Sequence, residues 1–231
     1  MGCNLRRKKQ IFSQSLDASA PKGRLILPQQ QVLREILDKN AKAYITQDTE
    51  LAGTIADLKE KPKLVVTDSQ VFGKVAPVVP KDILLTSFSI LMARHKGFLE
   101  GAVRGVKAID ALEDGDKVLI SEGCTHHRRC EDIGTYKIPK WLGEYTGKKI
   151  NIETTSGLSF ADDLSKYRMI IHCGACMLND REMRYRMKCA EDAGIPMTNY
   201  GTAIAYMKGI LGRSLEVLPE YKKMICSYYS Q

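Results

Sequence analysis

The chain has 231 residues, of which 44% are hydrophobic and 27% charged, so it has the composition of a globular protein with one large or two modest domains. No apolar run approaches the ~20 residues that cross a membrane, and no apolar stretch follows the charged N-terminus as in a secretory signal. The basic residues behind the net charge of +8 are scattered, and only 7% of residues are aromatic, which argues against nucleic acid as a partner. Because the chain shows no secretory signal, we expect a cytoplasmic protein.

From residue 28 to residue 112, short apolar runs alternate with segments of helical periodicity. Strands are predicted at residues 43–46, 64–67 and 83–86. Helices are predicted at residues 28–37, 49–58 and 97–112. Pro28 suits the first turn of its helix, and Asp68 and Ser87 follow strands as helix caps.

The sequence 113–116 (EDGD) predicts a turn, and we place a domain boundary there. After it, strands are predicted at residues 118–121, 150–153 and 169–171. Helices are predicted at residues 132–145, 179–193 and 201–208, the first with Pro139 near its start. Basic side chains on the helix at 179–193 are interpreted as a solvated face: Arg181, Arg184, Arg186 and Lys188.

Repeated alternation of strand and helix predicts an α/β fold in two domains, with mainly parallel β-sheets flanked by helices. In such sheets, ligands gather beyond the carboxyl ends of the strands. The predicted strand at 118–121 leads directly to Cys124, and the strand at 169–171 leads directly to His172. We therefore expect these two segments to contribute to one site.

The pattern C-x-H … H-C-x-x-C consists of Cys124, His126, His172, Cys173 and Cys176. Soft sulfur ligands favour zinc or an iron–sulfur cluster. An odd total of seven cysteines, without a secretory signal, argues against a disulfide framework. A thioredoxin-like redox pair is the alternative for the C-x-x-C segment, but the strand-to-helix context of that fold is not matched elsewhere. We interpret the pattern as a metal site.

Three thiolates are one short of the four that hold a common iron–sulfur cluster. The candidates for the fourth ligand are Glu122, His126 and His172, and the residues leave the choice open. One histidine would close a tetrahedral zinc site, whereas a 4Fe–4S cluster with a weaker fourth ligand would keep one exchangeable iron. Cys130 and Cys189 are interpreted as buried small hydrophobic residues.

The chain resembles the HydF family of FeFe-hydrogenase maturation scaffolds over approximately residues 17–220. The segments that carry the resemblance are 20–31 (APKGRLILPQQQ), 124–127 (CTHH), 132–134 (DIG), 172–179 (HCGACMLN) and 196–201 (PMTNYG). The resemblance implies a dimerisation domain at 17–114 and a cluster-binding domain at 115–231. It also implies a homodimer.

The resemblance further implies that Cys124, Cys173 and Cys176 bind a 4Fe–4S cluster, with Glu122, His126 or His172 as a possible further ligand. The family protein receives a two-iron precursor made with two radical-SAM maturases and delivers it to the FeFe-hydrogenase apo-enzyme. A chain of this kind is a scaffold and carrier of transient cargo, not an enzyme. A structural zinc or nucleic-acid-binding module and a 4Fe–4S hydro-lyase are the alternative functions.

The family also has a GTPase domain, which needs a G-x-x-x-x-G-K-[ST] loop to hold phosphates. That sequence does not occur in these 231 residues, so we do not expect the chain to hydrolyse GTP, and we interpret it as a truncated form or natural fragment. Residues 1–16 do not resemble the family's lead-in strand. We expect them to form an N-terminal tail, for which disorder is left open.

Overall fold

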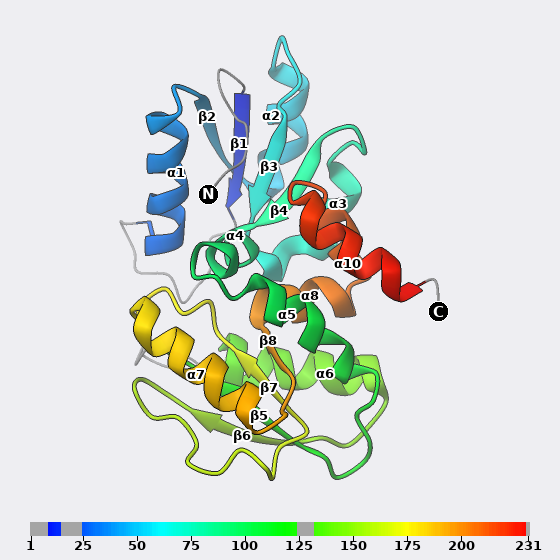
Figure 1. The fold of residues 1–231 in the computed structure, drawn as a ribbon. Helices are drawn as coiled ribbons and strands as arrows, with labels where there is room; N and C mark the ends of the chain where they lie inside the picture. The colour runs from blue at the N-terminus through cyan, green and yellow to red at the C-terminus, as the bar shows by residue number, and fades with distance from the viewer. Residues whose placement is uncertain (1–8, 15–24, 124–131, 230–231) are drawn as a thin grey trace. The chain divides into compact units, whose positions relative to one another are not determined.

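The computed structural model describes residues 9–14, 25–123 and 132–229, and the chain forms two compact units (Figure 1). The first unit contains residues 1–91 and 208–231, and the second contains residues 92–207. The expected boundary at residue 114 lies inside the second unit. The reason is that helix α5 (Leu99–Gly105) packs against strand β8 (Met197–Asn199), where Thr198 Oγ1 donates to the carbonyl of Ala102 at 2.9 Å.

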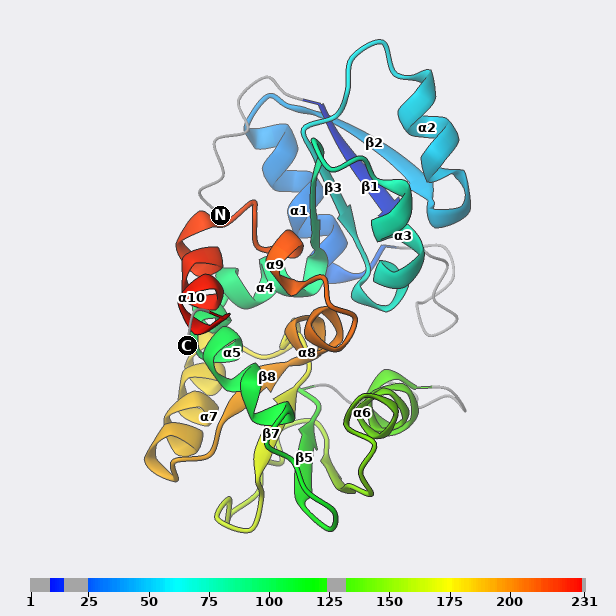
Figure 2. The ribbon, with the colours of Figure 1, turned by 90° about the vertical axis from the view of Figure 1, so that its right-hand side faces the viewer.

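The first unit is built on a four-stranded parallel sheet in the order β2-β1-β3-β4. Its strands are β1 (Lys9–Gln14), β2 (Lys42–Gln47), β3 (Leu64–Thr67) and β4 (Leu84–Ser87). Its helices are α1 (Leu27–Asp38), α2 (Leu51–Asp57), α3 (Phe72–Val78), α9 (Leu211–Ser214) and α10 (Pro219–Tyr229), and α4 (Phe88–His95) spans the division between the units. Figures 1 and 2 show α1 on one face of the sheet and α2 and α3 on the other. The connection from β1 to β2 runs in the opposite direction to those from β2 to β3 and from β3 to β4, so right-handed crossovers place their helices on opposite faces.

Strand β1 shows that residues 9–14, which lie within the expected N-terminal tail, form part of the sheet. It lies in the middle of the sheet, where Ile11 pairs with Tyr44 of β2 and with Val65 of β3. The strand has only two consecutive large apolar residues, Ile11 and Phe12, between polar and basic neighbours. An apolar run this short gives almost no periodic signal, so its assignment depends on partners that are distant in the sequence.

The second unit contains another four-stranded parallel sheet, in the order β6-β5-β7-β8. Its remaining strands are β5 (Lys117–Ser121), β6 (Asn151–Thr155) and β7 (Met169–His172). Its remaining helices are α6 (Ile138–Thr146), α7 (Asp180–Asp192) and α8 (Tyr200–Met207). Figure 2 shows α5 and α7 on one side of this sheet and α6 on the other. All four residues of β7 are buried, which is typical of a strand covered by helices on both faces.

Several helix boundaries depend on local chemistry that the sequence displays. Pro139 lies in the first turn of α6, as expected, after a single π-helical turn at Ile133–Lys137. Asn179 caps α7, because its side-chain oxygen accepts the backbone N–H of Glu182 at 2.8 Å. The helix expected at 97–112 is instead α5 followed by a 3₁₀ turn at Val106–Ile109.

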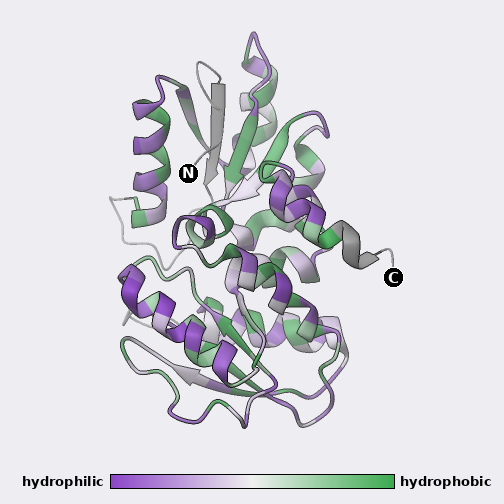
Figure 3. Ribbon diagram, in the orientation of Figure 1, coloured by the Kyte–Doolittle hydropathy of each residue, from purple (hydrophilic) through white to green (hydrophobic). Residues whose placement is uncertain are grey.

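The predicted fold class is confirmed, because both sheets are parallel and are flanked by helices. Figure 3 shows β3 as a largely hydrophobic strand and α7 as a largely hydrophilic helix. The three-residue strand β8 was not predicted, since it is too short to show a pattern. In the parts of the chain that the structure describes, no helix is long and apolar enough to span a membrane.

Candidate metal centre

The candidate centre lies where two neighbouring strands of the second unit end. Strands β5 and β7 pair so that Ser121 lies opposite His172, and the ladder continues one residue further, where Cys173 N donates to the carbonyl of Ser121 at 2.9 Å. After β5, the chain forms β6 on one side of that strand and then crosses over to form β7 on its other side. The crevice at such a switch point is where open parallel sheets bind ligands. Glu122 and Cys173 therefore follow the strands at the expected position.

The Cys173 sulfur accepts two backbone amides. Gly123 N lies 3.0 Å from Cys173 Sγ, and Ala175 N lies 3.4 Å from it. Ala175 adopts a left-handed backbone with φ of 54°, which is uncommon for a residue other than glycine and turns the C-x-x-C loop tightly. Amide donors directed at a sulfur stabilise its thiolate form, and this arrangement also tunes the sulfur ligands of iron–sulfur clusters. The C-x-x-C loop thus fits a metal-bound thiolate.

The second thiol of the loop, Cys176, is half-buried. Burial raises its pKa, and the neighbouring Cys173 raises it further. A thiol in this environment keeps its proton at neutral pH unless a cation replaces it. Metal binding here would therefore release a proton and bring the two sulfurs together as thiolates.

Lys96 holds the chain that follows the C-x-x-C loop. Its Nζ donates to the carbonyl of Leu178 at 2.9 Å and forms an ion pair with Asp180 Oδ1 at 2.8 Å. The Lys96 side chain is only 12% exposed, whereas Asp180 is largely exposed, so the bond to the Leu178 carbonyl is the better shielded of the two contacts. Lys96 consequently connects the start of α7 to the segment before α5, and it holds the residues that follow the C-x-x-C loop in place.

Glu122, one of the three candidates for the fourth ligand, is half-buried beside the loop. Tyr200 OH donates to Glu122 Oε1 at 3.2 Å. Burial, and then the charge of Glu122, hold the pKa of Tyr200 well above its usual value, so the phenol remains a donor. A Cβ atom at Gly134 would overlap both side chains, so the backbone of Gly134 packs directly against the pair. Glu122 is thus oriented by Tyr200 and by the backbone of Gly134.

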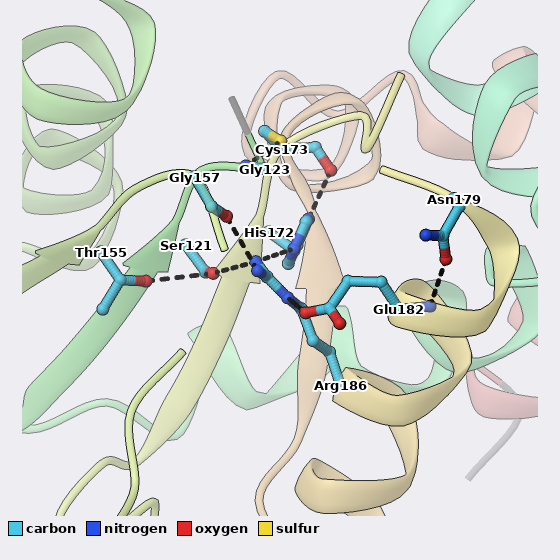
Figure 4. A network of polar contacts seen from close by, with 9 residues as sticks. All are labelled: Ser121, Gly123, Thr155, Gly157, His172, Cys173, Asn179, Glu182 and Arg186. Atoms are coloured by element: carbon cyan, nitrogen blue, oxygen red, sulfur yellow. Dashed lines mark hydrogen bonds and ion pairs between the residues drawn. The ribbon is translucent and has the colours of Figure 1, made fainter. Parts of the chain in front are cut away.

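His172, another candidate, is completely buried. Its Nδ1 lies 2.9 Å from the carbonyl oxygen of Cys173, and its Nε2 lies 3.2 Å from Arg186 Nη1. The ring of Phe98 packs edge-on against it, with 6.4 Å between ring centroids. Figure 4 shows His172 between the Arg186 guanidinium and the Cys173 backbone. The imidazole thus contacts Arg186 on one side and the loop backbone on the other.

Cys124 and His126 lie outside the described residues, as does Cys130. Among the residues that the structure does describe, no group of three or more histidine, cysteine, aspartate or glutamate side chains is arranged to hold a metal ion. Of the predicted ligands, the structure places Glu122, His172, Cys173 and Cys176 at one end of the sheet. The three-thiolate site remains a prediction.

Arg186 corrects the interpretation of α7 as carrying a uniformly solvated basic face. Its side chain is fully buried, whereas Arg184 is exposed. The signal was present in the sequence, because Met183, Arg186 and Ala190 share one face of the helix at i, i+3 and i+7 and all three are buried. Because charged residues are almost never fully buried unless they are paired, the burial of Arg186 indicates a polar network around it.

Two family descriptions match consecutive parts of the chain. Residues 6–97 match the family described as "Hydrogen maturase F dimerization domain", and residues 100–217 match "Hydrogen maturase F tetramerization domain". No curated protein matches the chain. Both descriptions name self-association, and neither names a metal.

Proposed function

This chain belongs to the hydrogen maturase F family, and from that premise we propose that it carries a 4Fe–4S cluster and a two-iron precursor during FeFe-hydrogenase maturation. Its two matched domains are those of a self-associating hydrogenase maturation scaffold. In the proposal, Cys124, Cys173 and Cys176 hold the cluster. The precursor comes from radical-SAM maturases and leaves to the hydrogenase apo-enzyme. The chain acts by binding and release, not by catalytic turnover.

The observation that carries the proposal is the geometry of Cys173. Its sulfur lies at the β5/β7 switch point and accepts the N–H of Gly123, the residue directly before Cys124 in the chain. The segment that leads to the third cysteine therefore reaches the C-x-x-C loop. A site of this kind suits a metal group held by sulfurs from both strand ends.

A 4Fe–4S cluster bound by three thiolates has one iron with an exchangeable ligand, and that position is where cargo could dock. The residues of the chain have distinct roles around it. The amides of Gly123 and Ala175 stabilise charge on Cys173, and Lys96 fixes the exit of the loop. Tyr200 orients Glu122, which we propose as a weak oxygen ligand at the exchangeable position.

Anaerobic reconstitution with iron and sulfide tests the cluster. We expect about four iron and four sulfide per chain and an EPR signal after reduction. Changing Cys124, Cys173 or Cys176 to Ala should abolish the signal, because each removes a thiolate. Cys189→Ala is the matched control, since Cys189 lies on α7 outside the loop and its loss should leave the signal intact.

Three results would contradict the proposal. Stoichiometric zinc without a cluster signal would favour a structural zinc site, and salt-dependent RNA or DNA binding would favour a nucleic-acid module. Turnover of a hydroxy acid by the reconstituted protein would favour a hydro-lyase. In the expected case, added imidazole changes the EPR signal by occupying the exchangeable position, and protein loaded with the two-iron precursor activates the hydrogenase apo-enzyme.

A further inference from the structure

We propose that Arg186 is a positioning residue for the C-x-x-C loop: it fixes the tautomer of His172, and His172 in turn holds the backbone of Cys173. The inference rests on the proposed function where it concerns the cluster, and on the described contacts alone where it concerns the tautomer. It gives His172 an orienting role in place of the ligand role considered for it.

The first step is the burial of Arg186. Its Nε donates to Glu182 Oε1 at 2.8 Å, and its Nη2 donates to the carbonyl of Gly157 at 2.9 Å. Its Nη1 contacts Ser121 Oγ and His172 Nε2, each at 3.2 Å. An arginine remains charged when buried, and its burial is costly unless hydrogen bonds and a counter-charge compensate. These contacts use four of the five guanidinium N–H groups, so the side chain is held in one orientation.

The second step is the tautomer. A guanidinium can only donate hydrogen bonds, so His172 Nε2, which faces Arg186 Nη1, must accept and cannot carry the ring proton. The proton therefore resides on Nδ1, where it is donated to the carbonyl oxygen of Cys173 at 2.9 Å. The opposite tautomer would direct two N–H groups at each other and leave the carbonyl without this donor.

The third step is the effect on the loop. The peptide N–H of Cys173 bonds to the carbonyl of Ser121, and the peptide carbonyl of Cys173 bonds to His172. Ser121 Oγ receives both Arg186 Nη1 and Thr155 Oγ1, the latter at 3.1 Å. Arg186 therefore contacts both residues that bond to the backbone of Cys173, namely Ser121 and His172 (Figure 4). Both ring nitrogens of His172 are engaged, so neither offers a lone pair to a metal while Arg186 is in place.

The test of the tautomer needs no cluster. Long-range ¹⁵N NMR of the 231-residue apo-protein shows which ring nitrogen of each histidine carries the proton, and His172→Gln identifies the His172 signals by their loss. We expect the Nδ1–H pattern for His172. An Nε2–H pattern in the unmodified protein would overturn the inference, whatever the protein binds.

The test of positioning uses Arg186→Met, which keeps an unbranched aliphatic side chain and removes every donor. Arg184→Met is the matched control, on the same helix but exposed. In Arg186→Met, we expect loss of the single His172 tautomer and about 10- to 100-fold weaker retention of iron against a chelator, the usual effect of removing a group that orients a metal ligand. Arg184→Met should change neither.

Two further outcomes separate the inference from the proposed function. If the reconstituted protein shows ¹⁴N coupling to the cluster that disappears in His172→Gln, His172 is a ligand and the inference fails. If the apo-protein shows the Nδ1–H pattern but takes up no cluster, the proposed function fails and the positioning of the loop stands. The NMR result on the unmodified protein decides the tautomer even if Arg186→Met does not fold.

Discussion

At the scale of the residue, hydrogen bonds from specific neighbours determine how readily a carboxylate ionises. Glu153 on β6 is the clearest example outside the candidate centre. Tyr167 OH donates to its Oε2 at 2.6 Å, and Lys166 Nζ donates to the same oxygen at 3.0 Å. Both bonds lower the pKa of Glu153, which falls to about 2, and the bond from Tyr167 has the larger effect. Local donors, rather than the net charge of the chain, thus set the ionisation of this side chain.

We predict that Tyr167→Phe raises the pKa of Glu153 towards the ordinary value of about 4.3, because the strongest donor is lost. Since the folded pKa is below the unfolded one, ionised Glu153 stabilises the fold fully above pH of about 4.3, and this stabilisation is lost as the pH falls towards 2. In Tyr167→Phe, the difference between the folded and unfolded pKa values of Glu153 becomes smaller, so this stabilisation is reduced. Side-chain ¹³C NMR titration measures the change, with Tyr145→Phe as the control; an unchanged Glu153 midpoint in Tyr167→Phe would contradict the assignment.

At the scale of the element, the close approach of α5 to β8 leaves no room for a side chain at the last residue of the helix. Gly105 is the last residue of α5, and a Cβ atom there would lie 2.7 Å from the carbonyl carbon of Met197 and 2.8 Å from its nitrogen. Backbone cannot move aside as a flexible side chain can. A glycine is therefore required at the contact, and the regular helix gives way to a 3₁₀ turn immediately after it.

We predict that Gly105→Ala destabilises the second unit by about 1–3 kcal/mol, because the added methyl group overpacks the contact with β8. The matched change Gly101→Ala is in the same helix, where the nearest atom to a new Cβ is a Phe98 ring carbon at 3.9 Å. It should stabilise by about 0.5–1 kcal/mol, as alanine does for glycine in a helix. Urea unfolding followed by circular dichroism measures both, and equal effects would refute the contact as the cause.

At the scale of the whole molecule, the chain leaves the first unit at residue 91 and returns to it at residue 208. Arg213 on α9 connects the returning segment to the end of α3. Its Nη1 donates to the carbonyl of Ala76 and its Nη2 to that of Val79, both at 2.6 Å, with Pro80 O a further acceptor at 3.0 Å. These carbonyls lie at a helix end and after it, where partners within the helix are missing.

We predict that Arg213→Met destabilises the first unit by about 1–3 kcal/mol, because these carbonyls lose their donors. Hydrogen exchange is the measurement, since it resolves the two units separately. Amides of α3 and β4 should lose protection, while those of β5 and β7 keep theirs. Arg104→Met is the control, because Arg104 is exposed and its pairing with Glu100 contributes little. Equal loss of protection in both units would show that Arg213 does not act within the first unit alone.

Much of the fold and part of the candidate centre could be predicted from local patterns. Strands such as β3 and β7 are short apolar runs, and Asn179 is a recognisable cap, so their positions follow from neighbours in the sequence. The central position of β1 could not be predicted, because its two apolar residues acquire meaning only beside β2 and β3. The charge of Arg186 predicts an exposed side chain, whereas its position on the apolar face of α7 predicts a buried one, and the side chain is buried.

Local patterns in the sequence are sufficient to predict the α/β class and to place Glu122, His172 and Cys173 at strand ends, because short apolar runs and the residues that follow them are local properties. The contacts of those side chains, in contrast, follow from the packing of distant segments. Arg186 reaches Ser121 and His172 from a different element, and Tyr200 reaches Glu122 likewise. Such contacts depend on how helices pack on the sheet, a relation between distant segments that no local pattern encodes.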